Sequence, residues 1–126
     1  MVNEKSLHAV YIVNEDGLNK VFTDIKETLA SQNDATLIYF SAENDFVYSR
    51  ELNILRKRYP SQFVIYKIRE SVLDKPSSFQ ELLEAIINAN TKEKLIFVLS
   101  GDEELNHIVS NCLWFLSIDK NQITRC

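Results

Sequence analysis

Hydrophobic residues follow two alternating patterns along the chain. Continuous apolar runs, typical of buried strands, occupy residues 8–13, 36–40, 63–68 and 95–99, with a shorter run near 122–124. Between them, apolar residues recur every three or four positions, the period of a helix with one buried face, at 18–29, 48–59, 79–87 and 105–116. The sequence therefore predicts strands and helices in regular alternation.

The strand runs are apolar at successive positions, so both faces of each strand need a cover. This pattern is typical of a parallel sheet with crossover helices on both faces. Ligands in such folds bind outside the carboxyl ends of the strands. We therefore expect any functional residues to follow Val13, Phe40, Ile68 and Leu99.

Signals for helix ends are found at several positions. Asp16 is a good N-cap for the first helix, and Ser78 with Glu81 three residues later forms a capping-box pattern for the third. Pro60 should end the second helix, whose last turn contains the cations 56–58.

Composition supports one α/β domain over residues 1–126. The chain has only two glycines and two prolines, too few for the many turns of a β-sandwich or barrel. Hydrophobic residues make up 45% and charged residues 25%, as in ordinary globular domains. A chain of this length buries enough surface to form a core without disulfides or metals.

Charge and cysteine content exclude several classes of function. The net charge of −4 argues against a nucleic-acid surface, which needs clustered cations. No apolar run approaches the length of a membrane span, and no signal peptide is evident. Cys112 and Cys126 form neither a metal motif nor a disulfide framework. We expect a cytoplasmic protein that binds neither nucleic acid nor membrane.

The turn after the first strand reads Asn14-Glu15-Asp16-Gly17. A dinucleotide site would need several glycines here so that backbone N–H groups can approach a diphosphate. Only Gly17 is present, and Glu15 and Asp16 place carboxylates where phosphates would lie. The acids also suit an ordinary helix N-terminus, so a purely structural role remains an alternative.

The turn after the fourth strand reads Ser100-Gly101-Asp102-Glu103-Glu104, again with acids before a helix. If the first and fourth strands are neighbours, these three acids join Glu15 and Asp16 in one acidic crevice. This expectation depends on the strand order.

No catalytic residue or metal ligand can be named from the sequence. Ser100 lacks the glycines of a nucleophile elbow, and His8 and His107 are not arranged with a nucleophile. Arg69, after the third strand, could contact a phosphate or be a solvated loop residue. The stretch 113–116 should close the core; alternatively, Trp114 or Phe115 faces a partner.

Several stretches together resemble the pyridine-nucleotide-binding half of the ferredoxin–NADP reductase family, over nearly the whole chain from about Leu7 to Ile123. The stretches that carry the resemblance are 37–39, 50–52 with Leu55, 95–101 and 116–123. The resemblance implies a three-layer Rossmann-like fold with five parallel strands in the order 3-2-1-4-5. It also implies NAD(P)H as the cofactor and a flavin-binding barrel as the neighbouring domain.

The family's phosphate loop is eroded in this sequence. Its Gly-Gly-Thr-Gly motif aligns with residues 14–17 and keeps only Gly17, and a proline at the start of the helix becomes Lys20. The Cys-Gly-Pro motif after the fourth strand becomes Ser100-Gly101-Asp102. The candidate cofactor-binding residues implied by the resemblance are Gly17, Asp16, Arg69, Ser100 and Gly101.

The flavin-binding barrel is not in this chain, and hydride transfer needs a flavin against the nicotinamide. We therefore expect no cofactor in isolation and a degenerate or stand-alone module with weak or lost nucleotide binding, acting in interaction or regulation. The alternative is a functional NAD(P)H-binding subunit that passes hydride to a flavin on a separate chain. The partner would be a flavin-containing reductase domain or another protein.

A response-regulator receiver domain is a third hypothesis. Residues 10–16 resemble a receiver's first strand and acidic pair, and Ser100 could be its fourth-strand hydroxyl. A receiver also needs a phosphoacceptor aspartate at the end of its third strand, where this chain has Lys67-Ile68-Arg69.

Overall fold

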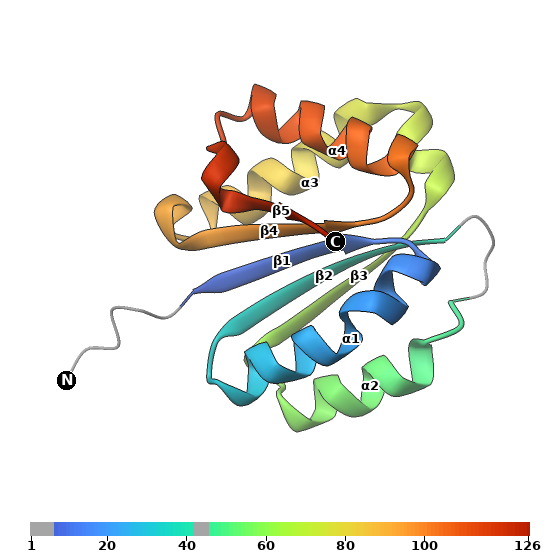
Figure 1. Cartoon of the computed structure of the whole chain (residues 1–126), viewed down its shortest axis with the longest axis vertical. Helices are drawn as coiled ribbons and strands as arrows, with labels where there is room; N and C mark the ends of the chain where they lie inside the picture. Colours follow the sequence, from blue (N-terminus) through green and yellow to red (C-terminus); the bar gives the residue numbers. More distant parts are fainter. Residues whose placement is uncertain (1–6, 42–45) are drawn as a thin grey trace.

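A parallel five-stranded sheet runs through the middle of the molecule (Figure 1). The computed structural model describes residues 7–41 and 46–126. The strands are β1 (His8–Val13), β2 (Asp34–Ser41), β3 (Phe63–Arg69), β4 (Leu95–Ser100) and β5 (Ile123–Arg125). Their order is β3-β2-β1-β4-β5, and every neighbouring pair is parallel. The fold class and the strand order expected from the sequence are confirmed.

Helices cover both faces of the sheet (Figure 1). The helices α1 (Glu15–Ala30) and α2 (Ser49–Arg58) lie on one face, and α3 (Pro76–Asn88) and α4 (Glu103–Phe115) lie on the other. Short 3-10 turns connect them at η1 (Glu70–Asp74), η2 (Lys92–Lys94) and η3 (Lys120–Gln122). The periodic stripes of the sequence thus become the helix faces that bury the sheet.

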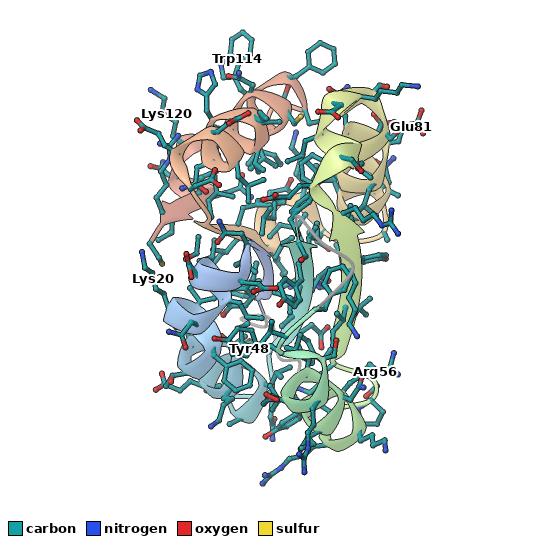
Figure 2. The ribbon with its side chains drawn as sticks, turned by 90° about the vertical axis from the view of Figure 1, so that its right-hand side faces the viewer. Lys20, Tyr48, Arg56, Glu81, Trp114 and Lys120 are labelled. Carbon is teal, nitrogen blue, oxygen red and sulfur yellow. The ribbon has the colours of Figure 1, made fainter. Side chains whose placement is uncertain are left out.

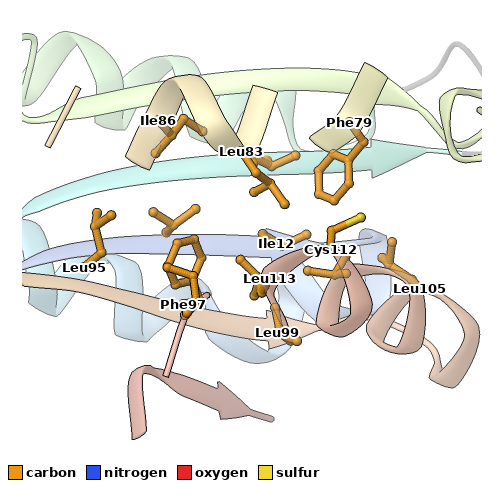
Figure 3. Packing of buried hydrophobic residues seen from close by; sticks show 14 of the residues in the cluster. Ile12, Phe79, Leu83, Ile86, Leu95, Phe97, Leu99, Leu105, Cys112 and Leu113 are labelled. Carbon is orange, nitrogen blue, oxygen red and sulfur yellow. The ribbon is translucent and has the colours of Figure 1, made fainter. Parts of the chain in front are cut away.

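Successive side chains of the central strand enter two separate cores, since strand residues alternate between the faces of a sheet. Ile12 points toward α3 and α4, where Phe79 and Leu113 are also fully buried (Figure 3). Its neighbour Tyr11 points the other way and packs in the cluster with Leu18 of α1. Full coverage of β1 explains why its apolar run has no polar interruption.

The cover is incomplete at the β3 edge of the sheet. Val64 is 46% exposed, and Lys67 and Arg69 are exposed as well, although 63–68 reads as a buried run. Side chains alternate along a strand, so Val64 lies on the α3 face with Tyr66 and Ile68, whereas Lys67 and Arg69 lie on the α2 face; both faces of β3 are therefore partly open. The expectation of full burial is therefore wrong for this strand, whose outer side has no neighbouring strand.

The third helix begins earlier than its capping signal predicts. It starts at Pro76, and the N-cap is Lys75 rather than Ser78, so the predicted capping box is wrong. Proline is favoured in the first turn because its fixed φ suits a helix and its missing N–H needs no partner there. The N–H of Ser78 already donates to the Lys75 carbonyl oxygen at 3.2 Å, inside this first turn. The second helix does end just before Tyr59 and Pro60, as predicted.

The stretch 113–116 closes the core only in part. Leu113 is fully buried, but Trp114 and Phe115 are 77% and 67% exposed, so the expectation that all four residues close the core is wrong. Successive helix residues are about 100° apart, and a single contact face cannot hold four in a row.

Two further expectations concern cysteines and membranes. Cys112 is buried and Cys126 is exposed, and both are free thiols. Within the described ranges, no helix has the length and apolar character to cross a membrane.

Candidate functional site

The turn after β1 is organised by Asn14. This residue has extended backbone angles, and its side-chain Oδ1 accepts the Gly17 N–H at 2.9 Å. Its carbonyl oxygen accepts the Leu18 N–H at 2.8 Å, which starts the helix. Asn14 is therefore the N-cap of α1, and the prediction that Asp16 fills this role is wrong. Glu15 and Asp16 instead occupy the first turn, where negative charge is favoured by the helix dipole.

Gly17 is required by space rather than by backbone conformation. A β-carbon at this position would lie 1.3 Å from the Ser100 carbonyl oxygen, and the described glycines have no positive φ. The buried Ser100 hydroxyl donates to the Gly17 carbonyl oxygen at 3.1 Å. These contacts hold the first turn of α1 directly against the end of β4.

The turn after β4 is capped by its own side chains. Asp102 is the N-cap of α4 and accepts the Leu105 N–H at 2.8 Å. The Asn106 side chain accepts the Gly101 N–H at 3.0 Å and donates to the Gly101 carbonyl oxygen at 3.3 Å. The Gly101 amide, which an anion at this turn would need, is thus already occupied.

The two acidic turns follow neighbouring strands at the carboxyl end of the sheet. Since Val13 is paired with Ser100, both acidic turns start side by side, as expected. However, α1 and α4 then run along opposite faces of the sheet (Figure 1). Glu15 and Asp16 therefore lie on a helix of one face and the acids 102–104 at the start of a helix of the other, and their convergence in one crevice stays a prediction.

A hollow of about 300 Å³ opens on the α4 side of this end of the sheet. Asp102 and Glu104 share its lining with Glu70 and Asp74 of η1. The η1 acids were missed in the sequence because a short 3-10 turn has no hydrophobic period. In the described part of the chain, no group of His, Cys, Asp or Glu could hold a metal ion.

The candidate residues fall into two groups. Gly17, Ser100 and Gly101 meet at the β1–β4 switch point, with Asp16 in the adjoining helical turn. Arg69 is exposed at the end of β3, paired with Ser41 and separated from β1 by β2. The side chain of Ser41 faces the α1 turn, with its Oγ 3.5 Å from Oε1 of Glu15. Arg69 therefore lies two strands away from β1, beside Ser41 and on the same face of the sheet as the α1 turn.

Tyr39, near the end of β2, carries a polar group that the sequence did not single out. The residue is fully buried, and within the described residues its hydroxyl makes no hydrogen bond of good geometry, although the Glu15 carboxylate and the Tyr48 backbone lie close to it. Burial, together with the negative charge of Glu15, raises the pKa of Tyr39 to about 12. Its ring packs edge-on against Phe46, with the centroids 5.1 Å apart.

The strand order separates this chain from receiver domains. Receivers of the flavodoxin-like class have the order 2-1-3-4-5. Here β3 lies at the outer edge beyond β2, and β1 pairs directly with β4. The order argues against the receiver hypothesis, in agreement with the missing aspartate at the end of β3.

Solved structures of ferredoxin-NADP+ reductase share this fold. The reductase from Plasmodium falciparum matches with a TM-score of 0.74 and 16% identity, covering 95% of this chain and 51% of that chain. A mutant of the same enzyme in complex with 2'P-AMP matches with a TM-score of 0.63 and 18% identity, covering 100% of this chain and 55% of that chain. No family model and no curated protein matches the sequence.

These comparisons establish a ferredoxin reductase-like fold of the α/β, Rossmann-like class. The chain spans about half the length of the reductase chains it matches. At this level of identity, the likeness concerns the fold alone, and function has to be argued from the residues at the site.

Proposed function

We propose that this chain is a non-catalytic interaction or regulatory module on the reductase-type NAD(P)-binding fold, with weak or lost nucleotide binding, and that it works in the cytoplasm. The observation that carries the proposal is that the backbone amides and the helix starts at the β1–β4 switch point are already occupied by the chain's own side chains. There, the Gly17 and Gly101 amides are bonded to Asn14 and Asn106, and carboxylates fill both first helical turns.

Electrostatics supports the loss of diphosphate binding. A phosphate charge and a carboxylate about 5 Å apart repel by roughly 3 kcal/mol at an effective dielectric constant near 20, before screening by salt. Glu15 and Asp16 both lie in the turn that would have to receive the diphosphate. Gly17, the one glycine left, serves the packing of α1 against β4, which is the role of the last glycine in a dinucleotide fingerprint.

The alternative is an NAD(P)H-binding subunit that delivers hydride to a flavin on another chain. One structural neighbour, the Plasmodium falciparum reductase mutant, is a complex with 2'P-AMP, which favours a nucleotide for this fold. Arg69 is exposed at the carboxyl edge of the sheet, where a guanidinium could contact a phosphate. This alternative needs the diphosphate to settle on the acidic α1 turn.

Calorimetric titration with NADPH and NADH separates the two functions. We expect no binding heat for the wild-type chain at nucleotide concentrations up to about 1 mM. The Glu15→Gly/Asp16→Thr variant should gain measurable binding, because it removes both charges at the turn. The control Glu81→Gln/Glu84→Gln changes the net charge by the same amount on the exposed side of α3, and it should show no binding heat.

A wild-type dissociation constant tighter than about 0.1 mM would overturn the proposal in favour of the NAD(P)H-binding subunit. Equal gains in the double variant and its control would show that overall charge, rather than the α1 turn, opposes the nucleotide.

A further inference from the structure

Two adjacent aromatic side chains stand out on the surface of the molecule. Trp114 and Phe115, in the last turn of α4, are 77% and 67% exposed, more than any other large hydrophobic residue described. Aromatic residues, tryptophan above all, are enriched at the centres of protein interfaces. Leu113 and Ile118, on either side in sequence, are buried and anchor this end of the helix.

A groove of about 420 Å³ opens beside Trp114. Its apolar walls come from Trp114, Ile118 and Ile123, and its charged groups are Lys120 and Arg125. The Arg125 guanidinium donates to Ser110 Oγ at 2.8 Å, which holds this cation at the groove. The lining contains no acidic residue, although the chain as a whole carries a net charge of −4.

This groove runs along β5 on the α4 face of the sheet: Arg125 at one end pairs with Leu99, whereas the Gly17 turn belongs to α1 on the opposite face. The Gln122 side chain donates to the carbonyl oxygens of Lys92 and Leu95, so η3 sits at the start of β4 rather than at its end. Figure 2 shows Trp114 and Lys120 at the α4 end of the molecule, with Arg56 of α2 at the opposite end. Binding at the groove would therefore leave the Gly17 turn uncovered.

We propose that this surface docks an acidic, apolar segment of a partner protein: a bulky hydrophobic side chain enters the groove beside Trp114, and neighbouring carboxylates contact Lys120 and Arg125. The inference rests on the proposed interaction function and names the surface and the chemistry of the partner. Charge complementarity selects this occupant. A cationic groove without acids favours carboxylates, and a guanidinium held by Ser110 can bind one with two hydrogen bonds.

Other occupants fit the groove less well. The same groove of a second copy, in a two-fold pairing, would bring Lys120 and Arg125 against like charges. A nucleic acid needs a larger cationic surface than two side chains on a chain of net charge −4.

The chain contains a built-in reporter, because Trp114 is its one tryptophan. Random peptides displayed on phage are selected against the whole chain, with counter-selection against the Trp114→Ala variant. The best peptide is then synthesised, together with a version in which every Asp and Glu becomes Asn or Gln. We expect enrichment of acidic peptides with a large apolar residue, and a blue shift of the Trp114 emission when the acidic peptide binds.

Variants locate the contact. Trp114→Ala and Arg125→Glu should each lower the affinity for the acidic peptide at least about tenfold. Calorimetry measures the affinity of Trp114→Ala, which lacks the fluorescent reporter. Arg56→Glu makes the same charge change at the far end of the molecule and should leave the affinity within about twofold. Trp114 is exposed, so its replacement should preserve the urea midpoint, which is checked first.

The proposal is overturned by three results: no selectable peptide, selected peptides without acidic residues, or affinity unchanged in Trp114→Ala and Arg125→Glu. A dimer in sedimentation that Trp114→Ala dissociates also overturns it, because the surface then belongs to a second copy. Nucleotide titration tests the proposed function separately. If the chain binds NADPH and still docks the peptide, only the proposed function is refuted. If the chain binds neither NADPH nor peptide, only the docking surface is refuted.

Discussion

The α-carbon of Gly17 lies against the main-chain carbonyl of Ser100, at a distance that leaves no room for a β-carbon. The two residues are also joined by the hydrogen bond from the Ser100 hydroxyl to the Gly17 carbonyl oxygen. The contact brings the first helix against the fourth strand, 83 residues further along the chain. A glycine that resembles part of a nucleotide motif thus has a complete structural reason for its presence.

Replacing Gly17 should destabilise the fold more than replacing Gly101. In Gly17→Ala the new β-carbon meets backbone atoms of Ser100, whereas in Gly101→Ala it meets Cδ2 of Leu105 at 2.5 Å, and a side-chain end can move. We expect Gly17→Ala to lower the free energy of unfolding by about 3 kcal/mol and Gly101→Ala by roughly half as much. Urea unfolding with unchanged slope measures both. Equal losses would contradict the assignment of Gly17 to backbone contact.

The two buried tyrosines of the α1 face should respond unequally to loss of their hydroxyls. Tyr11 donates to Oδ2 of Asp24 at 2.7 Å and also lies 2.8 Å from the Thr28 hydroxyl, while the Tyr39 hydroxyl makes no hydrogen bond of good geometry in the described residues. Tyr11→Phe should lower the free energy of unfolding by about 1–3 kcal/mol, because Asp24 and Thr28 lose their partner. Tyr39→Phe should change it by less than about 1 kcal/mol, because this hydroxyl makes no hydrogen bond of good geometry with its neighbours Glu15 and Tyr48. Chemical denaturation of the two variants measures both changes in the free energy of unfolding. A larger decrease for Tyr39→Phe than for Tyr11→Phe would contradict this prediction.

His8 should make the fold sensitive to mild acid. Burial lowers its pKa, which the Asp34 carboxylate opposes only partly, and Nε2 lies 2.6 Å from the Thr36 hydroxyl. Since the folded state binds the proton less readily than the unfolded state, stability is full above pH ~6.5 and falls as the pH drops through the lowered pKa. Urea midpoints between about pH 7 and pH 5 should therefore decrease, and His8→Gln, which does not titrate there, should show a flatter profile. Identical profiles for the two proteins would refute the role of His8.

The two cysteines should differ sharply in thiol reactivity. Cys126 is exposed, whereas Cys112 lies on the buried face of α4, and burial raises the pKa of its thiol. Thiolate is the reactive form, so a disulfide reagent should modify Cys126 quickly and Cys112 only after denaturation. Mass spectrometry of the native protein should show one adduct, and Cys126→Ser should show none. Rapid modification of that variant would mean that the α4 face opens readily.

The sequence was most informative where packing alone determines structure. The apolar runs of β1, β2 and β4 have no polar interruption because helices cover both of their faces, so their type and direction followed from the pattern. The same argument failed for β3, since a run such as 63–68 does not reveal that Val64 will face solvent at an edge. Strand order came from the resemblance to reductases and not from periodicity.

The site was predicted in its residue types but not in its contacts. Both Asn14 and Asp16 are good caps, and only the geometry shows that Asn14 holds the Gly17 amide. Glu70 and Asp74 line the hollow because they lie in a 3-10 turn, and no hydrophobic period in the sequence predicts that turn. The exposure of Trp114 was only one of two alternatives in the sequence, because the hydrophobicity of a residue does not tell whether its helix face meets the sheet or a partner.

The position of β1 has a consequence for synthesis on the ribosome. Of the five described strands, β1 is synthesised first and becomes the middle of the sheet, and its second neighbour, β4, begins only at Leu95. A nascent chain of β1, α1 and β2 therefore presents an apolar strand with one side unpaired until residues 95–100 have emerged, and such open edges invite aggregation. Chaperone contact during translation should be strongest in this interval and should end when residues 95–100 close the gap.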